Sequence, residues 1–177
     1  RTAAQWKAGF VRRRTFLGLV VAFILVLVAE PTPVLLYAGA GIMAVAHVLR
    51  LICTAYLDKD SRLITAGPFA YCRNPLYIGN ALVVIAFALM SGRLLALPIM
   101  LLLWLLTHAP TVACEQAILR DKFGADFDDY AERVPRWLPK LGGGRGEGEF
   151  RWSRVIENGE HINIISAWIL AAMFFVE

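Results

Sequence analysis

Five apolar runs follow one another along the chain, and polar or turn-rich segments separate them. The runs cover residues 15–29, 34–57, 76–90, 94–113 and 162–176. A helix needs about 20 apolar residues to cross a hydrocarbon core about 30 Å thick. The second and fourth runs reach that length, whereas the other three need flanking residues or a locally thinner bilayer. The pattern predicts an all-α protein, a polytopic transmembrane helix bundle with about five spanning helices.

The segments between these runs differ in length from one side of the bundle to the other. Residues 30–33 and 91–93 form tight turns on one side, with too few residues to carry chemistry. On the opposite side, a loop at 58–75 and a polar stretch from 114 to about 160 are much longer. We therefore expect the functional site on the side of the two longer segments.

The long polar stretch divides further. Residues 115–123 extend the fourth helix beyond its apolar run, Gly124 is a suitable C-cap, and residues 126–133 predict another short helix. The last segment either covers a substrate portal, pairs with a second protomer or anchors the tail. The predicted parts are a basic interfacial arm (1–14), a transmembrane core (15–140), a glycine-rich flexible linker (141–150) and a C-terminal amphipathic or transmembrane helix (151–177).

Composition and charge support a membrane protein. The chain has 177 residues, of which 58% are hydrophobic and 18% charged, and this is too apolar for an ordinary soluble domain. If the N-terminal arm lies in the cytosol, all of the 18 Lys and Arg residues except Arg93 lie on or near the cytosolic side, as the positive-inside rule requires. We expect an integral, multi-pass membrane protein whose N-terminus and functional site face the cytosol. The net charge of +4 then reflects topology, and we expect no nucleic-acid binding.

Several catalytic classes find no support in the sequence. Cys53, Cys72 and Cys114 fit neither a zinc pattern nor a CxxC redox pair, and the histidines are too scattered for a metal site. A P-loop, an HExxH motif, a GxGxxG motif and a Ser-His-Asp set are all missing. We expect no bound metal, and ATPase, metalloprotease and hydrolase functions are excluded.

The most informative polar segment lies between the second and third apolar runs, at residues 65–80. Asn74 and Pro75 mark a helix start, since Asn is a strong N-cap and Pro is favoured at the first helical position. In the simplest interpretation the pair does only this. In the second interpretation, the helix N-terminus and the adjacent Arg73 form an anion-binding corner at the membrane surface.

Other polar residues lie within or beside the apolar runs. Glu115 follows about 20 apolar residues, where a carboxylate needs a partner or a function, and Gln116 can add an amide contact. His47 and Arg50 share one helix face, and His108 lies on the fourth run. Structural interpretations also exist, namely a snorkelling surface carboxylate for Glu115 and a hydrogen-bonded buried imidazole for His47.

Three segments of the chain form recognisable motifs. They are Gly67-Pro68-Phe69-x-Tyr71-x-Arg73-Asn74-Pro75-x-Tyr77-x-Gly79, then Glu115-Gln116-x-x-Leu119-x-x-x-Phe123-Gly124-x-x-Phe127-x-x-Tyr130, and finally Val134-Pro135-Arg136-Trp137-Leu138-Pro139. The first two resemble the Gly-Pro-Tyr…Arg-His/Asn-Pro-x-Tyr-x-Gly and Glu-Glu…Phe-Gly-x-x-Tyr-x-x-Tyr segments of the integral-membrane methyltransferases, which include isoprenylcysteine carboxyl methyltransferases and phosphatidylethanolamine N-methyltransferases, and the third matches the usual close of the second. Leu49-Arg50 also resembles the Leu-Arg pattern that precedes the first motif in that family. The similarity covers roughly residues 45–140, and Asn74, Gln116 and Phe127 depart from the commonest residues of the family.

The resemblance implies an enzyme with a cytosolic pocket for S-adenosylmethionine. The methyl acceptor would be hydrophobic or membrane-embedded, of the isoprenylcysteine carboxylate or phospholipid amine type. The resemblance assigns catalysis to Arg73, Asn74 and Glu115, and we add His47, Arg50 and His108 as candidate contacts for the acceptor. The residues expected to contact the cofactor are Gly67, Pro68, Tyr71, Arg73, Asn74, Pro75, Tyr77, Glu115 and Gln116.

Two other functions stay open. One is an NADPH enzyme like the sterol reductases, a group that shares a related C-terminal half but normally has about twice as many helices. The other is a non-catalytic membrane adaptor with a relict site. Binding of S-adenosylmethionine, of NADPH or of neither separates the three functions, and the sequence alone does not predict the oligomeric state.

Overall fold

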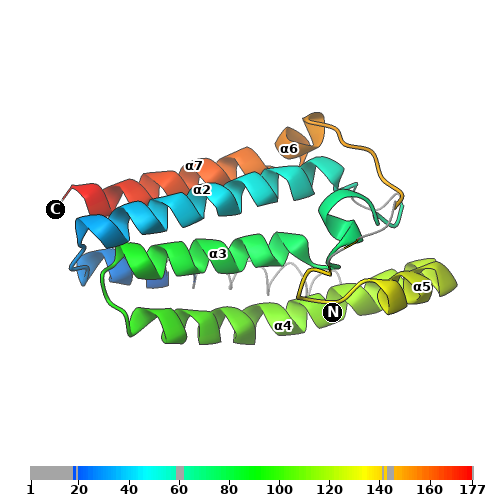
Figure 1. Ribbon diagram of the computed structural model, residues 1–177, viewed down its shortest axis with the longest axis horizontal. Helices are drawn as coiled ribbons and strands as arrows, with labels where there is room; N and C mark the ends of the chain where they lie inside the picture. Colours follow the sequence, from blue (N-terminus) through cyan, green and yellow to red (C-terminus); the bar gives the residue numbers. More distant parts are fainter. Residues whose placement is uncertain (1–17, 19, 59–61, 141, 143–145, 177) are drawn as a thin grey trace, which may run out of the picture.

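The computed structural model describes residues 18, 20–58, 62–140, 142 and 146–176, and within these residues it is all-helical, without a strand. Figure 1 shows long helices running side by side, with α2 against α7 and α3 against α4. The N-terminal arm at 1–14 lies outside the described residues. The elements are α2 (Pro33–Tyr56), η1 (Gly67–Ala70), α3 (Pro75–Met90), α4 (Ala96–Phe123), α5 (Ala125–Arg133), α6 (Ser153–Glu157), α7 (Glu160–Ala172) and η2 (Met173–Phe175).

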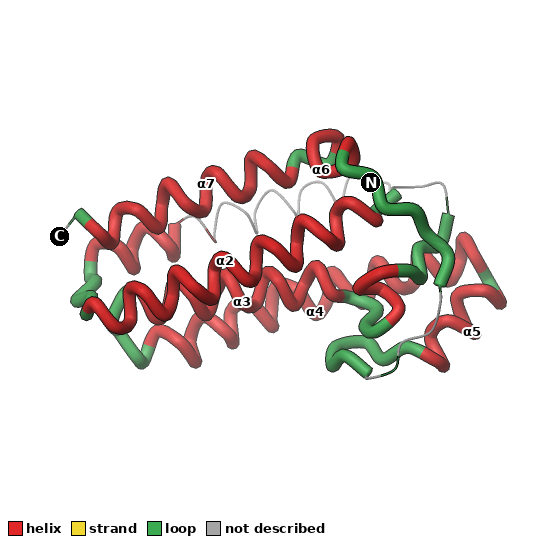
Figure 2. Tube along the Cα trace, turned by 45° about the horizontal axis from the view of Figure 1, so that its top comes forward, coloured by secondary structure: helices red, strands yellow, loops and turns green. Residues whose placement is uncertain are grey.

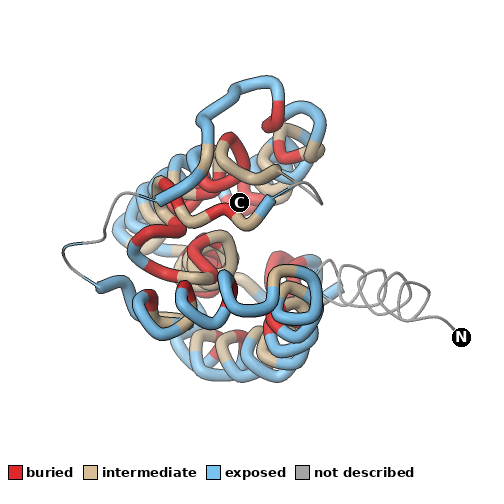
Figure 3. The backbone as a smooth tube through the Cα atoms, turned by 90° about the vertical axis from the view of Figure 1, so that its right-hand side faces the viewer, coloured by how far each residue is buried: buried red, intermediate tan, exposed pale blue. Residues whose placement is uncertain are grey.

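Two of these helices, α2 and α4, are long and apolar enough to cross a membrane. Helix α3 and the helical stretch Glu160–Phe175 are apolar but shorter, and residues 20–27 are helical as well. The helices follow the apolar runs of the sequence closely, so the all-helical prediction is confirmed. Figure 3 shows the buried residues on the inward faces of the helices and the exposed ones around the outside.

The closest packing is between α2 and α3. A Cβ atom on Gly39 of α2 would lie 2.5 Å from Met90 Cγ and 2.8 Å from the Ala86 carbonyl oxygen, so the two backbones approach closely only because this position lacks a side chain. Met43 and Phe174 are almost fully buried in the same core. The C-terminal residues therefore complete the packing of α2 and α3.

The two tight turns meet at one end of the bundle, as their shortness predicts. The Glu30 N–H donates to the Ser91 carbonyl over 2.9 Å, and the exposed side chains of Arg93 and Glu30 form an ion pair. Gly92 has φ +69° and no room for a Cβ beside the Glu30 carbonyl. This end is closed by backbone contacts and carries little polar chemistry.

At the opposite end, called the α5 end below, α4 continues to Phe123 and stops at Gly124, which has φ +52° and donates its N–H to the Arg120 carbonyl over 2.8 Å. The chain then folds into α5 (Figure 1). Both the extension of α4 and the short helix after it are thereby confirmed. Helix α5 packs Phe127 and Tyr130 inward, against Phe123 and its neighbours.

Part of the predicted glycine-rich linker packs against another segment of the chain. Residues 141 and 143–145 lie outside the described residues, but the segment from 146 onward is fastened to the loop before η1. The N–H groups of Thr65 and Ala66 donate to the Glu147 carbonyl over 2.9 and 3.1 Å, and a side chain at Gly146 would collide with the Thr65 carbonyl. Glycine allows this close approach of two backbone segments because it has no side chain.

Helices α6 and α7 lie along α2 (Figures 1 and 2). The Arg154 guanidinium donates to Asp58 over 2.8 Å, and both side chains are largely buried. Arg154 also donates to the Tyr56 carbonyl. The C-terminal segment therefore packs against α2 of the same chain, beside the α5 end of that helix.

Candidate functional site

The start of α3 is built by the segment after α5. The Arg73 N–H donates to the Pro135 carbonyl and the Asn74 side-chain amide donates to the Arg136 carbonyl, each over 2.9 Å. The Cys72 thiol lies within 3.4 Å of the same Arg136 carbonyl. Residues 72–74 and 135–137 therefore form one tied unit at the α5 end.

Asn74 occupies the N-cap position as predicted, but the prediction that its side chain caps the helix is wrong. Its amide makes no bond to the α3 backbone, because it is turned toward the Arg136 carbonyl. Pro75 supplies the helical φ of the first position without needing a hydrogen-bond acceptor. The side chain thus positions the 135–137 segment, and the helix start relies on proline.

A cavity of about 620 Å³ opens between the helices at this end. Its walls come from α2, the 57–74 loop, α3, α4, α5 and α7, so segments far apart in the sequence meet there. Helix α7 contributes Glu160 and Asn163. The polar lining residues include Arg50, Thr54, Arg73, Asn74, Tyr77, Asn80, Glu115, Gln116, Lys122, Asn158, Glu160 and Asn163.

The cavity gathers half of the residues that the sequence singled out. Those at its lining are Arg50, Arg73, Asn74, Tyr77, Glu115 and Gln116. Elsewhere in the structure, Gly67 and Pro68 begin η1, Pro75 is buried at the start of α3, and Tyr71 is 45% exposed. These four help shape the loop but do not line the cavity.

The two histidines also lie off the cavity wall. The His47 ring is 6.0 Å from that of Trp168 of α7, centroid to centroid. His108 stacks on Trp104 at 5.2 Å and meets the Tyr77 ring edge-on at 5.7 Å. Among the predicted acceptor contacts, only Arg50 therefore lines the cavity, and His108 reaches it through Tyr77.

Tyr77 and Glu115 form the polar link across the cavity. The Tyr77 hydroxyl, on the first turn of α3, donates to the Glu115 carboxylate of α4 over 2.9 Å. Neither residue is adjacent to the other in sequence, so this bond fixes the separation of α3 and α4 at the cavity. It gives the Glu115 carboxylate a partner, which an acidic group near the hydrocarbon boundary requires.

Three buried polar atoms at this lining have no hydrogen-bond partner within the described part of the chain. They are Thr54 Oγ1, Arg73 Nε and Gln116 Nε2. Leaving such an atom unsatisfied costs about 1–3 kcal/mol, and here three of them face one cavity. The arrangement is suited to a polar ligand with both acceptor and donor groups.

A model of the phospholipid methyltransferase family matches residues 19–126 of this chain. The chain belongs to that family. It is 30% identical to a cobalt-zinc-cadmium resistance protein of Cupriavidus metallidurans over 82% of this chain and 67% of that protein. It is 32% identical to a nickel-cobalt-cadmium resistance protein of Alcaligenes xylosoxydans xylosoxydans over 66% of this chain and 55% of that protein.

The methyltransferase resemblance extends to a eukaryotic relative. The chain is 30% identical to a protein-S-isoprenylcysteine O-methyltransferase of Schizosaccharomyces pombe over 48% of this chain and 36% of that protein. The chain thus spans between about a third and two thirds of the length of these relatives. No solved structure matches it.

One buried ion pair at the cavity joins α2 to α7. Arg50 of α2 forms a two-point ion pair with Glu160 of α7, with Nε to Oε1 at 2.6 Å and Nη2 to Oε2 at 2.8 Å. The two side chains are only 10% and 4% exposed. Glu160 was not predicted as a site residue. A signal existed, since it is the acidic residue that precedes the last apolar run, while Arg50 is the basic residue inside the second.

Gly79 explains how Arg50 fits between helices. A Cβ at Gly79 would lie 2.5 Å from Arg50 Cγ, so the arginine stem crosses α3 where the side chain is missing. Glycine in the Tyr77-x-Gly79 part of the family motif therefore makes room for an arginine from another helix. Sequence reasoning identified the motif but not this contact.

The loop around Arg73 also carries shifted protonation equilibria. Burial, together with the Arg136 guanidinium, lowers the pKa of Arg73. Burial raises the pKa of the Cys72 thiol and of the Tyr130 phenol, so both groups are neutral near pH 7. The Tyr130 hydroxyl donates to the Phe69 carbonyl over 2.8 Å and holds α5 against η1.

Proposed function

We propose that this chain is an S-adenosylmethionine-dependent methyltransferase that acts on a hydrophobic or membrane-embedded acceptor. The observation that carries the proposal is the set of unpartnered polar atoms on Thr54, Arg73 and Gln116, which face one cavity at the family motifs. A volume of about 620 Å³ suits a ligand of cofactor size. We also propose that the bundle has about five spanning helices and that this cavity faces the cytosol.

The lining fits the charges of the cofactor. S-Adenosylmethionine carries a carboxylate, an amino group and polar ribose and base groups, and when bound it supplies a methyl group on a positively charged sulfur. Arg73 is suited to the carboxylate. Glu115 is suited to a cationic or hydroxyl group, and Gln116 and Thr54 can satisfy their unpartnered atoms on the remaining polar groups.

The protein's part in methyl transfer is alignment and exclusion of water. The Tyr77–Glu115 hydrogen bond holds the two helices that carry the motifs at a set distance, which favours a fixed orientation of bound groups. Phe69 and Phe127 add apolar surface to the lining. A dry pocket strengthens an anionic nucleophile by removing its hydration shell.

For the acceptor, we propose the part of the cavity lined by Arg50, Asn80, Glu160 and Asn163, between α2, α3 and α7. An acceptor of the isoprenylcysteine carboxylate type needs no proton removed, whereas a phospholipid amine does. Because His47 and His108 lie off the wall, Glu115 is the better candidate for taking up that proton.

Two relatives are named for resistance to cobalt, zinc, cadmium or nickel. For this chain we propose methyl transfer and not metal binding, because the unpartnered groups at the cavity are a guanidinium, an amide and a hydroxyl. Guanidinium and amide nitrogens are not ligands for these ions. Within the described part of the chain, no three His, Cys, Asp or Glu side chains are arranged to hold a metal ion.

The test is calorimetric titration of the full chain in detergent with S-adenosylmethionine, S-adenosylhomocysteine and NADPH. We expect binding of the first two to wild type, weakened at least tenfold, or about 1.4 kcal/mol, in Arg73→Ala and in Glu115→Ala. Arg133→Ala and Glu157→Ala are the matched controls, since both side chains are exposed away from the cavity.

The other outcomes decide between the functions left open. Binding of NADPH in place of S-adenosylmethionine would support an enzyme related to the sterol reductases. A folded wild type that binds none of the three up to about 1 mM would favour the adaptor. Equal affinity in wild type and both cavity variants would place the cofactor elsewhere in the protein.

A further inference from the structure

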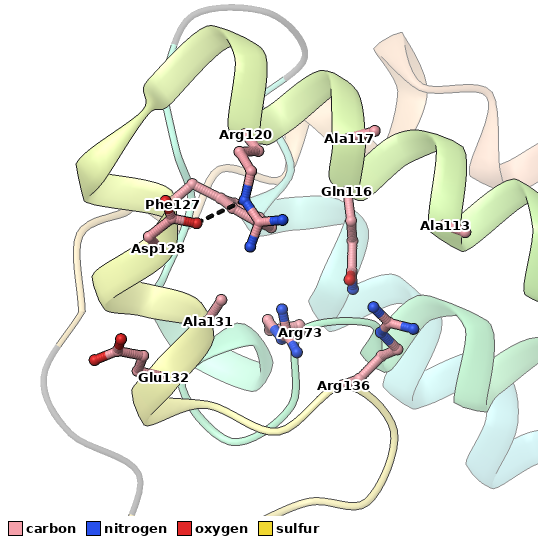
Figure 4. A pocket seen from close by; sticks show the side chains of 10 residues that line it. All are labelled: Arg73, Ala113, Gln116, Ala117, Arg120, Phe127, Asp128, Ala131, Glu132 and Arg136. Atoms are coloured by element: carbon pink, nitrogen blue, oxygen red, sulfur yellow. Dashed lines mark hydrogen bonds and ion pairs between the residues drawn. The ribbon is translucent and has the colours of Figure 1, made fainter.

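Three arginines converge on a second hollow beside the cofactor cavity. The hollow has a volume of about 580 Å³ and lies between α4, α5 and the 135–137 segment. Figure 4 shows the guanidinium groups of Arg73, Arg120 and Arg136 pointing into the same space, with the Gln116 amide among them. We call Arg73, Gln116, Arg120 and Arg136 the arginine cluster. The alanines of α4 at 113 and 117 leave the space open.

Among the described residues that line the hollow, one carboxylate pairs with an arginine of the cluster, and the other two arginines have no carboxylate partner there. Arg120 pairs with Asp128 over 2.6 Å. Glu132, the other acidic lining residue, is turned outward in Figure 4. Arg73 and Arg136 therefore face the hollow as two like charges, and their proximity contributes to the lowered pKa of Arg73.

Backbone hydrogen bonds hold these like charges together. The carbonyl of Arg136 accepts from the Asn74 amide, and the carbonyl of the preceding Pro135 accepts from the Arg73 N–H. Like charges close together destabilise a fold unless a counter-charge is bound. Two donors that face the hollow, Arg73 Nε and Gln116 Nε2, are buried and without a partner in the part of the chain that the structure describes. Gln116 is itself only 7% exposed.

We propose that the arginine cluster binds a phosphate-type oxyanion in this hollow, which adjoins the cofactor cavity and shares Arg73 and Gln116 with it. Guanidinium forks match the geometry of phosphate oxygens, and each contact is a charge-assisted hydrogen bond. Three guanidiniums and an amide offer more donors than a single carboxylate can accept. The cluster lies at the α5 end, where the phosphate of a lipid headgroup and a soluble phosphate can both reach it.

The proposal goes beyond methyl transfer and can be tested apart from it, because Arg120 and Arg136, unlike Arg73 and Gln116, do not line the cofactor cavity. These two positions are therefore the ones to change. The backbone carbonyl of Arg136, and not its side chain, ties the segment to Asn74, so Arg136→Gln leaves that bond in place. Arg133→Gln is the matched control, because Arg133 is an exposed arginine of α5 outside the hollow.

The first arm uses inorganic phosphate and glycerol 3-phosphate, titrated by calorimetry into the full chain in an uncharged detergent at low salt. We expect both to bind wild type and Arg133→Gln equally, and to bind Arg120→Gln and Arg136→Gln at least tenfold more weakly. Affinity should fall as ionic strength rises, because the cluster is partly open to solvent. S-Adenosylmethionine affinity is measured on the same samples and should change less than twofold.

The second arm identifies the source of the phosphate. The chain is placed in phosphatidylcholine nanodiscs with or without phosphatidic acid, and inorganic phosphate is titrated again. Weaker phosphate binding in the presence of phosphatidic acid, together with a rise in the unfolding midpoint that Arg136→Gln abolishes, identifies a lipid headgroup. Unchanged phosphate binding identifies a soluble ligand.

Two results would overturn the proposal. Phosphate affinity that is the same in wild type and in the Arg120→Gln and Arg136→Gln variants would mean that the cluster holds no oxyanion. A parallel loss of phosphate and S-adenosylmethionine affinity in Arg136→Gln would mean that the hollow is an extension of the cofactor cavity. Failure of S-adenosylmethionine binding in wild type would count against the methyltransferase proposal alone.

Discussion

Arg50 and Arg73 both line the cofactor cavity, yet their side chains differ in the partners that they have. Arg50 has a carboxylate partner, Glu160, bound at two points between α2 and α7. Arg73 has a buried Nε atom without a partner in the described residues, and the positive charge of Arg136 contributes to lowering its pKa. A satisfied buried pair holds helices in register, whereas an unsatisfied cation is available to a ligand. The comparison assigns structure mainly to Arg50 and binding mainly to Arg73.

The largest expected effect comes from breaking the satisfied pair. Glu160→Gln leaves the buried Arg50 guanidinium without a counter-charge, and we expect a loss of about 3–5 kcal/mol of stability. The measurement is thermal or denaturant unfolding of the full chain in detergent. Glu157→Gln, at the exposed last residue of α6, is the control and should change stability little.

A double variant sharpens the same point. Arg50→Met with Glu160→Leu removes both charges, and we expect it to recover most of the stability that Glu160→Gln loses, because no unpaired charge is left inside. If Glu160→Gln alone cost less than about 1 kcal/mol, the pair would not hold α7 against α2. The structural role assigned to Arg50 would then be wrong.

The second prediction concerns the unsatisfied cation. Arg73→Gln removes a charge that is repelled by Arg136, so stability should stay the same or rise, while the affinity for S-adenosylmethionine falls by about 2 kcal/mol, or roughly thirtyfold. Unfolding and calorimetric titration of one preparation measure both quantities. A large loss of stability with unchanged affinity would reverse the roles given to the two arginines.

Sequence reasoning found one side of this comparison more readily than the other. Arg73, Glu115 and Tyr77 lie in short motifs with close spacing, and the structure brings them to one cavity. Glu160 is 110 residues from Arg50 in the chain, so the position of each charge beside or inside an apolar run marks the residue but does not identify its partner. The helices were predictable because apolar length is a property of each segment alone.

Side-chain direction was the part that local patterns did not predict. Asn74 has the residue type of an N-cap, but a tertiary acceptor, the Arg136 carbonyl, takes its amide. The glycine-rich composition predicts a flexible segment, yet Gly146 lies against the Thr65 carbonyl, where a Cβ atom would have no room. In both places a contact made by the folded chain outweighs the local preference.

The third prediction tests the space that Arg50 needs. Gly79→Ala places a Cβ against the stem of Arg50 and should cost about 1–3 kcal/mol, because a buried stem between packed helices has little room to shift. Gly41→Ala is the matched control on α2, where a Cβ would meet nothing within 4 Å. Unfolding midpoints of the two variants provide the measurement, and equal midpoints would show that Arg50 is mobile enough to move aside.

The smallest expected effect lies beside Arg73 and depends on pH. Burial raises the pKa of Tyr130 above the ordinary value of about 10, so the folded state disfavours its ionised form. Its contribution to stability is therefore complete below pH 10 and is lost as pH rises above that value, where the unfolded chain ionises first.

Tyr130→Phe should cost about 1 kcal/mol at pH 8 through the lost bond to the Phe69 carbonyl. The difference in unfolding free energy between wild type and Tyr130→Phe, measured by denaturant unfolding, should then narrow at alkaline pH. Tyr71→Phe, at an exposed tyrosine, should show neither change. If the difference in unfolding free energy between wild type and Tyr130→Phe stayed constant from pH 8 to beyond pH 10, the phenol would be open to solvent. Water would then also reach the loop that carries Arg73.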